Sequence, residues 1–118
     1  MEENITIDPK DAQDNKLMAI LAYLGILVLV PIFAAKESPF ARFHANQGLI
    51  LLIVEIAVYI VFYILAIALA LSGFWWLISL ISFVVYLGIL IFVILGIVNA
   101  AKGEAKELPL IGKYRILK

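Results

Sequence analysis

One cluster of polar residues opens a long apolar run and contains the only histidine of the chain. Its members are Arg42, His44, Asn46 and Gln47. A histidine can exchange a proton near neutral pH, and an arginine binds phosphate through several N–H groups. This polar cluster therefore predicts a site at the membrane surface, for lipid headgroups or for a protein partner.

A second set of polar residues lies inside the apolar runs, at helical spacing. Its members are Glu55, Tyr59, Tyr63, Ser79, Ser82 and Tyr86. If the two runs that contain them form a tight hairpin about Ser72-Gly73, Tyr59 faces Tyr86 and Tyr63 faces Ser82 at matching depth. Glu55 then lies about one turn from Tyr86. We expect these side chains to form an intramembrane polar stripe.

Glu55 is the only charged residue within the apolar runs. A carboxylate in the middle of a membrane helix costs about 2.5–3.5 kcal/mol, so such residues are candidates for function. In the structural interpretation, Glu55 is protonated and donates to a backbone carbonyl, for example that of Leu27. In the functional interpretation, it belongs to a polar path between protomers.

The composition leaves little material for catalysis or for binding a cofactor. The chain has no cysteine and one histidine, and no phosphate-binding or zinc-binding motif is present. A nucleophile and its base cannot be assembled from these residues. We expect no enzymatic activity, no metal and no cofactor, and the net charge of zero argues against a nucleic-acid partner.

The distribution of apolar and charged residues indicates a membrane protein. Of the 118 residues, 65% are hydrophobic, against about 45–50% in soluble proteins. Apart from Glu55, charges occur only in segments 2–16, 36–42 and 102–118. Water therefore contacts only the two ends of the chain and one short segment between them.

Three apolar runs are each long enough to cross a bilayer: 17–35, 49–71 and 74–98. They predict an all-α polytopic membrane bundle of three transmembrane helices. Ser38-Pro39 predicts the start of a short interfacial helix that leads into the second span. Pro31 should kink the first span and release the carbonyl of Leu27.

The predicted domains are a flexible acidic tail over 1–15, the membrane domain over 16–103, and a basic tail over 104–118 that is either amphipathic or flexible. With three spans, the two ends lie on opposite sides of the membrane. Two Lys or Arg residues lie on the N-terminal side and seven on the other. This bias favours an N-terminus outside and a C-terminus in the cytoplasm.

Three local patterns resemble those of a known family. They are Pro31 before a short polar link, the stretch FARFHANQG over 40–48, and NAAKGE over 99–104 followed by Pro109. Together they resemble small prokaryotic membrane proteins of unknown function that are similar to the twenty-kilodalton subunit of the chloroplast inner-envelope import translocon (Tic). The resemblance implies a helical membrane domain and a role near protein translocation.

From the sequence we expect a non-enzymatic accessory or binding component of a complex in a prokaryotic cytoplasmic membrane. Its expected partners are the lipid bilayer and either a second copy or another membrane protein, because small residues suit helix contacts. The alternative is a component for translocation of peptides or transport of small solutes, with the polar stripe as its path.

Overall fold

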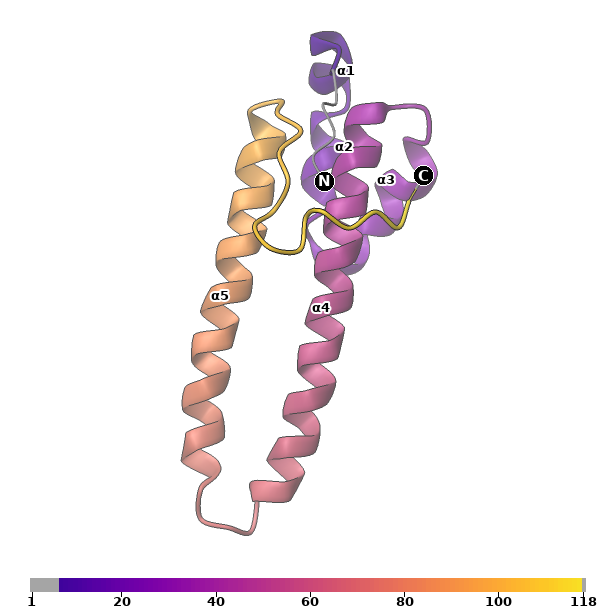
Figure 1. Cartoon of the computed structure of the whole chain (residues 1–118). Coiled ribbons are helices and arrows are strands. Elements are labelled where there is room, and N and C mark those ends of the chain that lie inside the picture. Colours follow the sequence, from indigo (N-terminus) through magenta and orange to yellow (C-terminus); the bar gives the residue numbers. More distant parts are fainter. Residues whose placement is uncertain (1–6, 118) are drawn as a thin grey trace.

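The computed structural model of the chain describes residues 7–117. Its dominant feature is a hairpin of two long helices, α4 (Pro39–Leu69) and α5 (Trp75–Ala101), as Figure 1 shows. Every regular element of the described residues is a helix. Both long helices are apolar and long enough to cross a membrane, so the all-helical membrane architecture agrees with the prediction, with two candidate spans.

Helix α4 begins where the sequence predicts it. The hydroxyl of Ser38 accepts a hydrogen bond from the backbone N–H of Ala41 at 3.0 Å, and Pro39 occupies the first helical position. The hairpin reverses between the two helices at Gly73, whose φ of +83° suits glycine. The predicted interfacial helix is therefore the first part of α4.

The predicted first span over 17–35 is not confirmed, because this run does not form one long helix. It forms α2 (Lys16–Leu21), the 3₁₀ helix η1 (Gly25–Val28) and α3 (Leu29–Ala34). A six-residue helix is about 9 Å long, far short of the roughly 30 Å of hydrocarbon. The run bends near Gly25, whose φ is +63°, and returns to the side from which it came (Figure 1). We call residues 16–34 the bent segment.

The predicted kink at Pro31 is also not found. Pro31 is the third residue of α3, where helical N–H groups have no partner within the helix, so its missing N–H breaks no helical bond. The carbonyl of Leu27 accepts from the backbone N–H of Leu29. The change in direction comes instead from the residues around Gly25.

The two ends of the chain pack with the bent segment and the start of α4 into one unit, which we call the head (residues 7–48 and 100–117). Helix α1 (Pro9–Asp14) lies where a flexible tail was expected, and residues 1–6 of that tail lie outside the described residues. Residues 104–117, the strap, run without a helix across α4 (Figure 1). Both ends therefore lie on one side of the hairpin, which corrects the predicted arrangement with the ends on opposite sides.

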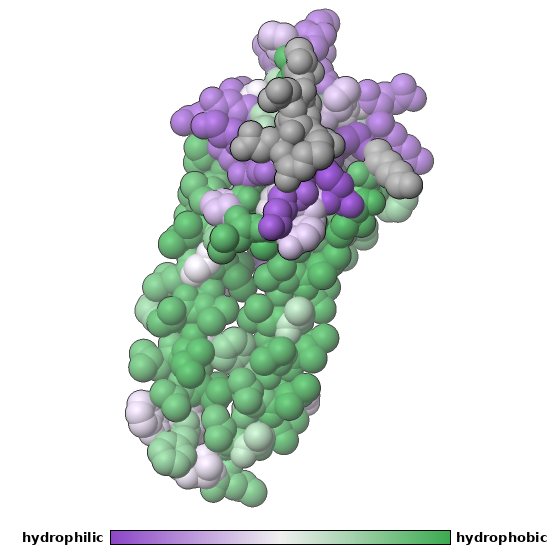
Figure 2. Space-filling model, viewed as in Figure 1, coloured by the Kyte–Doolittle hydropathy of each residue, from purple (hydrophilic) through white to green (hydrophobic). Residues whose placement is uncertain are grey.

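The distribution of polarity follows this division. Hydrophilic residues gather on the head and hydrophobic residues cover the hairpin, as Figure 2 shows. The 31 residues of α4 extend over about 46 Å, which exceeds the hydrocarbon thickness of about 30 Å. Counting about 20 residues back from Leu69 places the near edge of the hydrocarbon close to Ile50. The first turns of α4 therefore belong to the head.

Candidate functional site

The polar cluster predicted at the membrane surface lies inside the head, on the first three turns of α4. His44, Asn46 and Gln47 are buried, and each binds the backbone of the strap. His44 Nε2 lies 2.8 Å from the carbonyl oxygen of Glu104. Backbone groups need partners wherever water is excluded. The cluster therefore provides hydrogen-bond partners for the backbone of the strap, a segment that has no secondary structure of its own.

Gln47 holds both sides of a turn in the strap. Its Nε2 donates to the carbonyl of Gly112 at 2.8 Å, and its Oε1 accepts from the backbone N–H of Leu108 at 2.8 Å. A Cβ atom added to Gly112 would lie 2.6 Å from that Oε1. The absence of a side chain at residue 112 thus lets the strap approach α4 closely.

Asn46 binds the next part of the strap in the same way. Its Nδ2 donates to the carbonyl of Tyr114 at 2.8 Å, and its Oδ1 accepts from the N–H groups of Ile116 and Leu117 at 2.6 and 2.9 Å. One amide side chain therefore binds three backbone groups. Together with Gln47, it fixes the strap over residues 108–117.

His44 connects the strap to the bent segment. Its Nδ1 lies 2.6 Å from the hydroxyl of Tyr23, and both side chains are buried. Burial raises the pKa of the Tyr23 phenol above its ordinary value, so the hydroxyl keeps its proton and can donate. The Glu104 carbonyl only accepts, so the proton of a neutral imidazole is on Nε2 and Nδ1 accepts from Tyr23.

Aromatic rings surround His44 on three sides. The ring centroids of Phe40, Phe43 and Tyr23 lie 4.8, 5.2 and 5.6 Å from that of His44, each in an edge arrangement. Because both ring nitrogens have partners and the side chain is fully buried, His44 has no face open to a lipid phosphate. The structure thus gives His44 an internal partner instead of the predicted headgroup.

Arg42 lies apart from the other members of the cluster. Its Nη1 is 3.4 Å from the carbonyl oxygen of Ile32, near the end of α3. Another arginine completes the surroundings of the cluster: Arg115 pairs with Glu107 at 2.6 Å and lies over the Phe43 ring at 5.5 Å. Arg42 therefore links α4 to α3, and Arg115 links the strap to α4, all within the head.

Close backbone contacts hold the bent segment against both long helices. A Cβ atom at Gly48 on α4 would lie 1.8 Å from the carbonyl oxygen of Ala22, and one at Gly96 on α5 would lie 2.3 Å from the Tyr23 ring. Only glycine permits such approaches. The end of α2 therefore packs directly on both helices at the top of the hairpin.

Asp11 is a further structural residue of the head. Its carboxylate accepts from the hydroxyl of Ser38 at 2.6 Å and from the N–H of Phe40 at 3.0 Å. Asp8 is the N-cap of α1, whereas Asp11, although it belongs to α1, caps the start of α4. The positive end of the helix dipole also stabilises a negative charge at this position.

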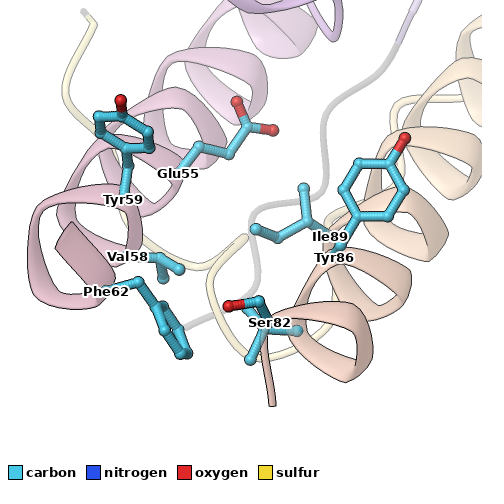
Figure 3. Close-up of a pocket in the computed structure, with 8 residues that line it drawn as sticks. Glu55, Val58, Tyr59, Phe62, Ser82, Tyr86 and Ile89 are labelled. Carbon is cyan, nitrogen blue, oxygen red and sulfur yellow. The ribbon is translucent and has the colours of Figure 1, made fainter. Parts of the chain in front are cut away.

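The predicted stripe is brought together in part. Glu55, Tyr59, Ser82 and Tyr86 line a groove of about 230 Å³ between α4 and α5 (Figure 3). Tyr63 and Ser79 are exposed and do not line it. The hydroxyls of Tyr59 and Tyr86 lie on opposite sides of the groove.

Hydrocarbon side chains separate the polar groups of this groove. They come from Val58 and Phe62 on α4 and from Val85 and Ile89 on α5. Within the described residues, no hydrogen bond joins Glu55 to Leu27 or to another member of the stripe. One copy of the chain therefore forms a largely apolar groove with a carboxyl group at its side.

Sequence reasoning missed Tyr23, Gly96 and the carbonyl of Glu104. Tyr23 is the only tyrosine of the first apolar run, which is a signal for a buried hydroxyl that needs a partner. A backbone carbonyl has no such signal, because every residue carries one. The strap could not be identified as the partner of His44 from residue types.

These features define an integral membrane protein of the helical-hairpin class, with a head that holds its own C-terminal strap. The chain belongs to the magnetosome magnetite crystal formation protein family, whose sequence profile it matches over residues 14–116. This match corrects the resemblance to the chloroplast import subunit. The resemblance rested in part on the stretch over 40–48. In this structure that stretch binds the strap, which is no indication of a role in protein import.

Relatives agree with this membership. The chain is 33% identical to the magnetosome protein MamF of Magnetospirillum gryphiswaldense over 114 residues, which cover 94% of each chain. It is 35% identical over 98 residues to MamF of Paramagnetospirillum magneticum, covering 83% of this chain and 79% of that protein. The magnetosome protein MmsF of the latter organism is 30% identical over 95 residues, or 80% of this chain and 79% of that protein. No solved structure matches the chain.

Proposed function

We propose that this protein is a non-enzymatic component of the magnetosome membrane that contributes to magnetite crystal formation. The observation that supports this most is the family match over nearly the whole chain, from residue 14 to residue 116. The structure agrees with a role without catalysis, because the single histidine has both nitrogens engaged in fixing the head. The protein thus acts through binding.

The binding surface in this proposal is the membrane-embedded groove between α4 and α5 that Glu55, Tyr59 and Tyr86 line. The side chains of Tyr59 and Tyr86 are exposed there. Glu55 is half-buried beside the groove, and a polar side chain from a neighbouring membrane helix would satisfy its carboxyl group. We therefore infer contact with a second copy or with another membrane protein through this groove. The separated polar groups give a translocation path no support.

The orientation that we propose places the head in the cytoplasm. Every Lys and Arg of the described residues lies in the head or at the top of α5, and the connection over 70–74 has none. Positive residues are retained on the cytoplasmic side of bacterial membranes. The short connection then faces the magnetosome lumen.

Deletion of the gene in its host bacterium, followed by complementation, tests the proposal. We expect altered crystal diameters in electron micrographs of the deletion strain, and restoration by the unaltered gene. A Glu55→Leu variant should restore them poorly, whereas the matched Ile56→Leu variant should restore them fully, because Ile56 is exposed outside the groove. Unchanged crystals after deletion would refute the role in crystal formation.

A fluorescent protein fused to the strap end tests the location and the side of the membrane. We expect fluorescence along the magnetosome chain. Fluorescence also reports the side of the membrane, because green fluorescent protein matures in the cytoplasm.

In the complementation experiment, equal full restoration by Glu55→Leu and Ile56→Leu would exclude the groove as the binding surface. That result would leave the role in crystal formation itself in place.

A further inference from the structure

The strap contains a turn that presents a leucine outward. Leu108 is buried at the start of this turn, and Leu110 is 85% exposed. The turn is closed by hydrogen bonds from the N–H of Gly112 to the carbonyl of Leu108 at 3.0 Å and from Ile111 to Pro109 at 2.7 Å. Leu110 thus adds a large exposed apolar side chain to those that the bent segment already exposes, such as Ile26 and Phe33.

The backbone of this leucine is strained. Leu110 has a φ of +68°, and no other described residue except glycine has a positive φ. Glycine normally occupies such a position because a Cβ atom lies too close to the following carbonyl oxygen there, and asparagine is tolerated because its short side chain forms local hydrogen bonds. Strain of this kind persists where surrounding contacts impose it, and Gln47 binds the turn on both sides. If Leu110 faced water, its exposed side chain would contribute no stability to offset this strain.

The position of the turn along the hairpin indicates what covers it. Ile111 lines a second, apolar groove between α4 and α5, nearer the head than the groove at Glu55, together with Leu51, Val54 and Phe92. Leu51 lies about 27 Å along the helix from Leu69, so these residues are at the near edge of a hydrocarbon layer of about 30 Å. In Figure 1 the strap descends beside α5 before it crosses α4. The turn therefore reaches the depth at which acyl chains meet headgroups.

The rest of the strap continues the same apolar face. Tyr114 and Ile116 are 57% and 49% exposed, and they alternate with the half-buried Arg115 and Leu117. Lys113 is exposed beside them. An aromatic ring, aliphatic side chains and a lysine are the residue types that lie at a membrane interface.

We propose that the strap docks on the lipid leaflet on the head side of the bilayer. Leu110 enters the acyl chains, Tyr114 and Ile116 lie at the level of the headgroups, and Lys113 binds lipid phosphate. Lipid is the occupant because the turn lies at the hydrocarbon edge and a cation stands beside the exposed apolar face. This inference rests on the hairpin crossing a membrane and is independent of any role in crystal formation.

Cysteine labelling tests the docking, since the chain has no native cysteine. Single variants Leu110→Cys and Ile116→Cys of the full chain are labelled with the environment-sensitive dye NBD and reconstituted in vesicles of phosphatidylcholine and phosphatidylglycerol. Gln13→Cys, exposed on α1, is the reference in water, and Ile60→Cys, exposed in the middle of the hairpin, is the reference in hydrocarbon. The Ile116 probe keeps the test valid if a substitution at the strained turn prevents folding.

We expect emission from positions 110 and 116 at shorter wavelengths than from position 13, with loss of quenching by aqueous iodide. A spin label at carbon 5 of the acyl chain should quench both positions more than one at carbon 12, with the reverse at position 60. Emission and iodide quenching like those of position 13 would overturn the proposal. So would a blue shift that disappears when the protein is diluted in lipid, because a second copy would then cover the strap.

Discussion

The hydroxyl of Tyr23 lies 2.6 Å from Nδ1 of His44, and both side chains are buried at the point where three parts of the head meet. Tyr23 follows α2 in the bent segment, His44 belongs to α4, and the second nitrogen of His44 binds the strap. A buried polar network fixes one arrangement only when all its members are satisfied. This pair therefore determines how the head assembles on the hairpin.

Removing the Tyr23 hydroxyl should destabilise the head. We expect Tyr23→Phe to lower the free energy of unfolding by about 1–3 kcal/mol, because Nδ1 of His44 is left buried without a donor. His44→Ala should cost more, about 2–5 kcal/mol, since a cavity is added. Denaturant unfolding in detergent micelles, followed by circular dichroism, measures both. Tyr114→Phe, at an exposed tyrosine, is the control and should change little.

Stability should depend on Tyr23 at alkaline pH. Burial raises the pKa of this phenol in the folded protein above the value of about 10 that it has when unfolded. Below about pH 10 the phenol is protonated in both states, and its contribution to stability is complete. Above that pH the phenol ionises first in the unfolded state, so the free energy of unfolding falls as pH rises. The free energy of unfolding should fall more between pH 8 and 11 in the unaltered protein than in Tyr23→Phe. Equal losses in the two proteins would contradict the assignment.

The glycines that contact the bent segment should tolerate no side chain. Gly48→Ala would place Cβ 1.8 Å from a backbone oxygen that cannot move aside easily, and we expect a loss at or above the upper end of the usual 1–3 kcal/mol for overpacking. Gly96→Ala meets the ring of Tyr23 at 2.3 Å and should also destabilise. The matched control is Gly88→Ala on α5, where nothing lies within 4 Å. Thermal unfolding of all three in the same detergent compares them.

The cap that α1 provides to α4 can be tested with two aspartates of one helix. Asp11→Ala removes the acceptor for Ser38 and Phe40, and we expect a loss of about 1–2 kcal/mol. Asp14→Ala removes only an exposed pair with Lys10, so its effect should stay below about 0.5 kcal/mol. Equal effects of the two variants on unfolding would show that Asp11 does not cap α4.

The amide side chains of α4 should control the release of the strap. Asn46→Ala removes the partner of three backbone groups, and we expect faster cleavage by trypsin after Lys113 and Arg115. Mass spectrometry of timed digests in lipid nanodiscs identifies the sites. Gln13→Ala, at an exposed position on α1, should leave the cleavage rate unchanged. An unchanged rate in Asn46→Ala would mean that other contacts hold the strap.

Local signals in the sequence were sufficient for the hairpin. Uninterrupted apolar runs define α4 and α5, and Ser38-Pro39 marks the start of α4 because capping depends only on neighbouring residues. Helical spacing also brought Glu55 and Tyr59 to one groove with Ser82 and Tyr86. Such features follow from residues that are near in sequence or paired by a short turn.

The bent segment and the strap could not be predicted in the same way. The number of apolar residues in 17–35 does not tell whether they form one helix, and the bend depends on contacts of Ala22 with Gly48 and of Tyr23 with Gly96. Hydrogen-bonding side chains such as Asn46 look the same whether they bind a headgroup or a backbone. The partners here are backbone groups 60 or more residues away, which no spacing rule identifies.

The uncharged connection between α4 and α5 has a consequence for biogenesis. When the hairpin enters a bilayer, only the short segment around Ser72-Gly73 crosses to the other side. Because that segment contains no lysine or arginine, none of these charges has to cross the membrane. Each such charge would cost about 2.5–3.5 kcal/mol at the centre of the membrane. The two helices can therefore enter together as one unit, without a motor that pulls a folded or charged domain through the membrane.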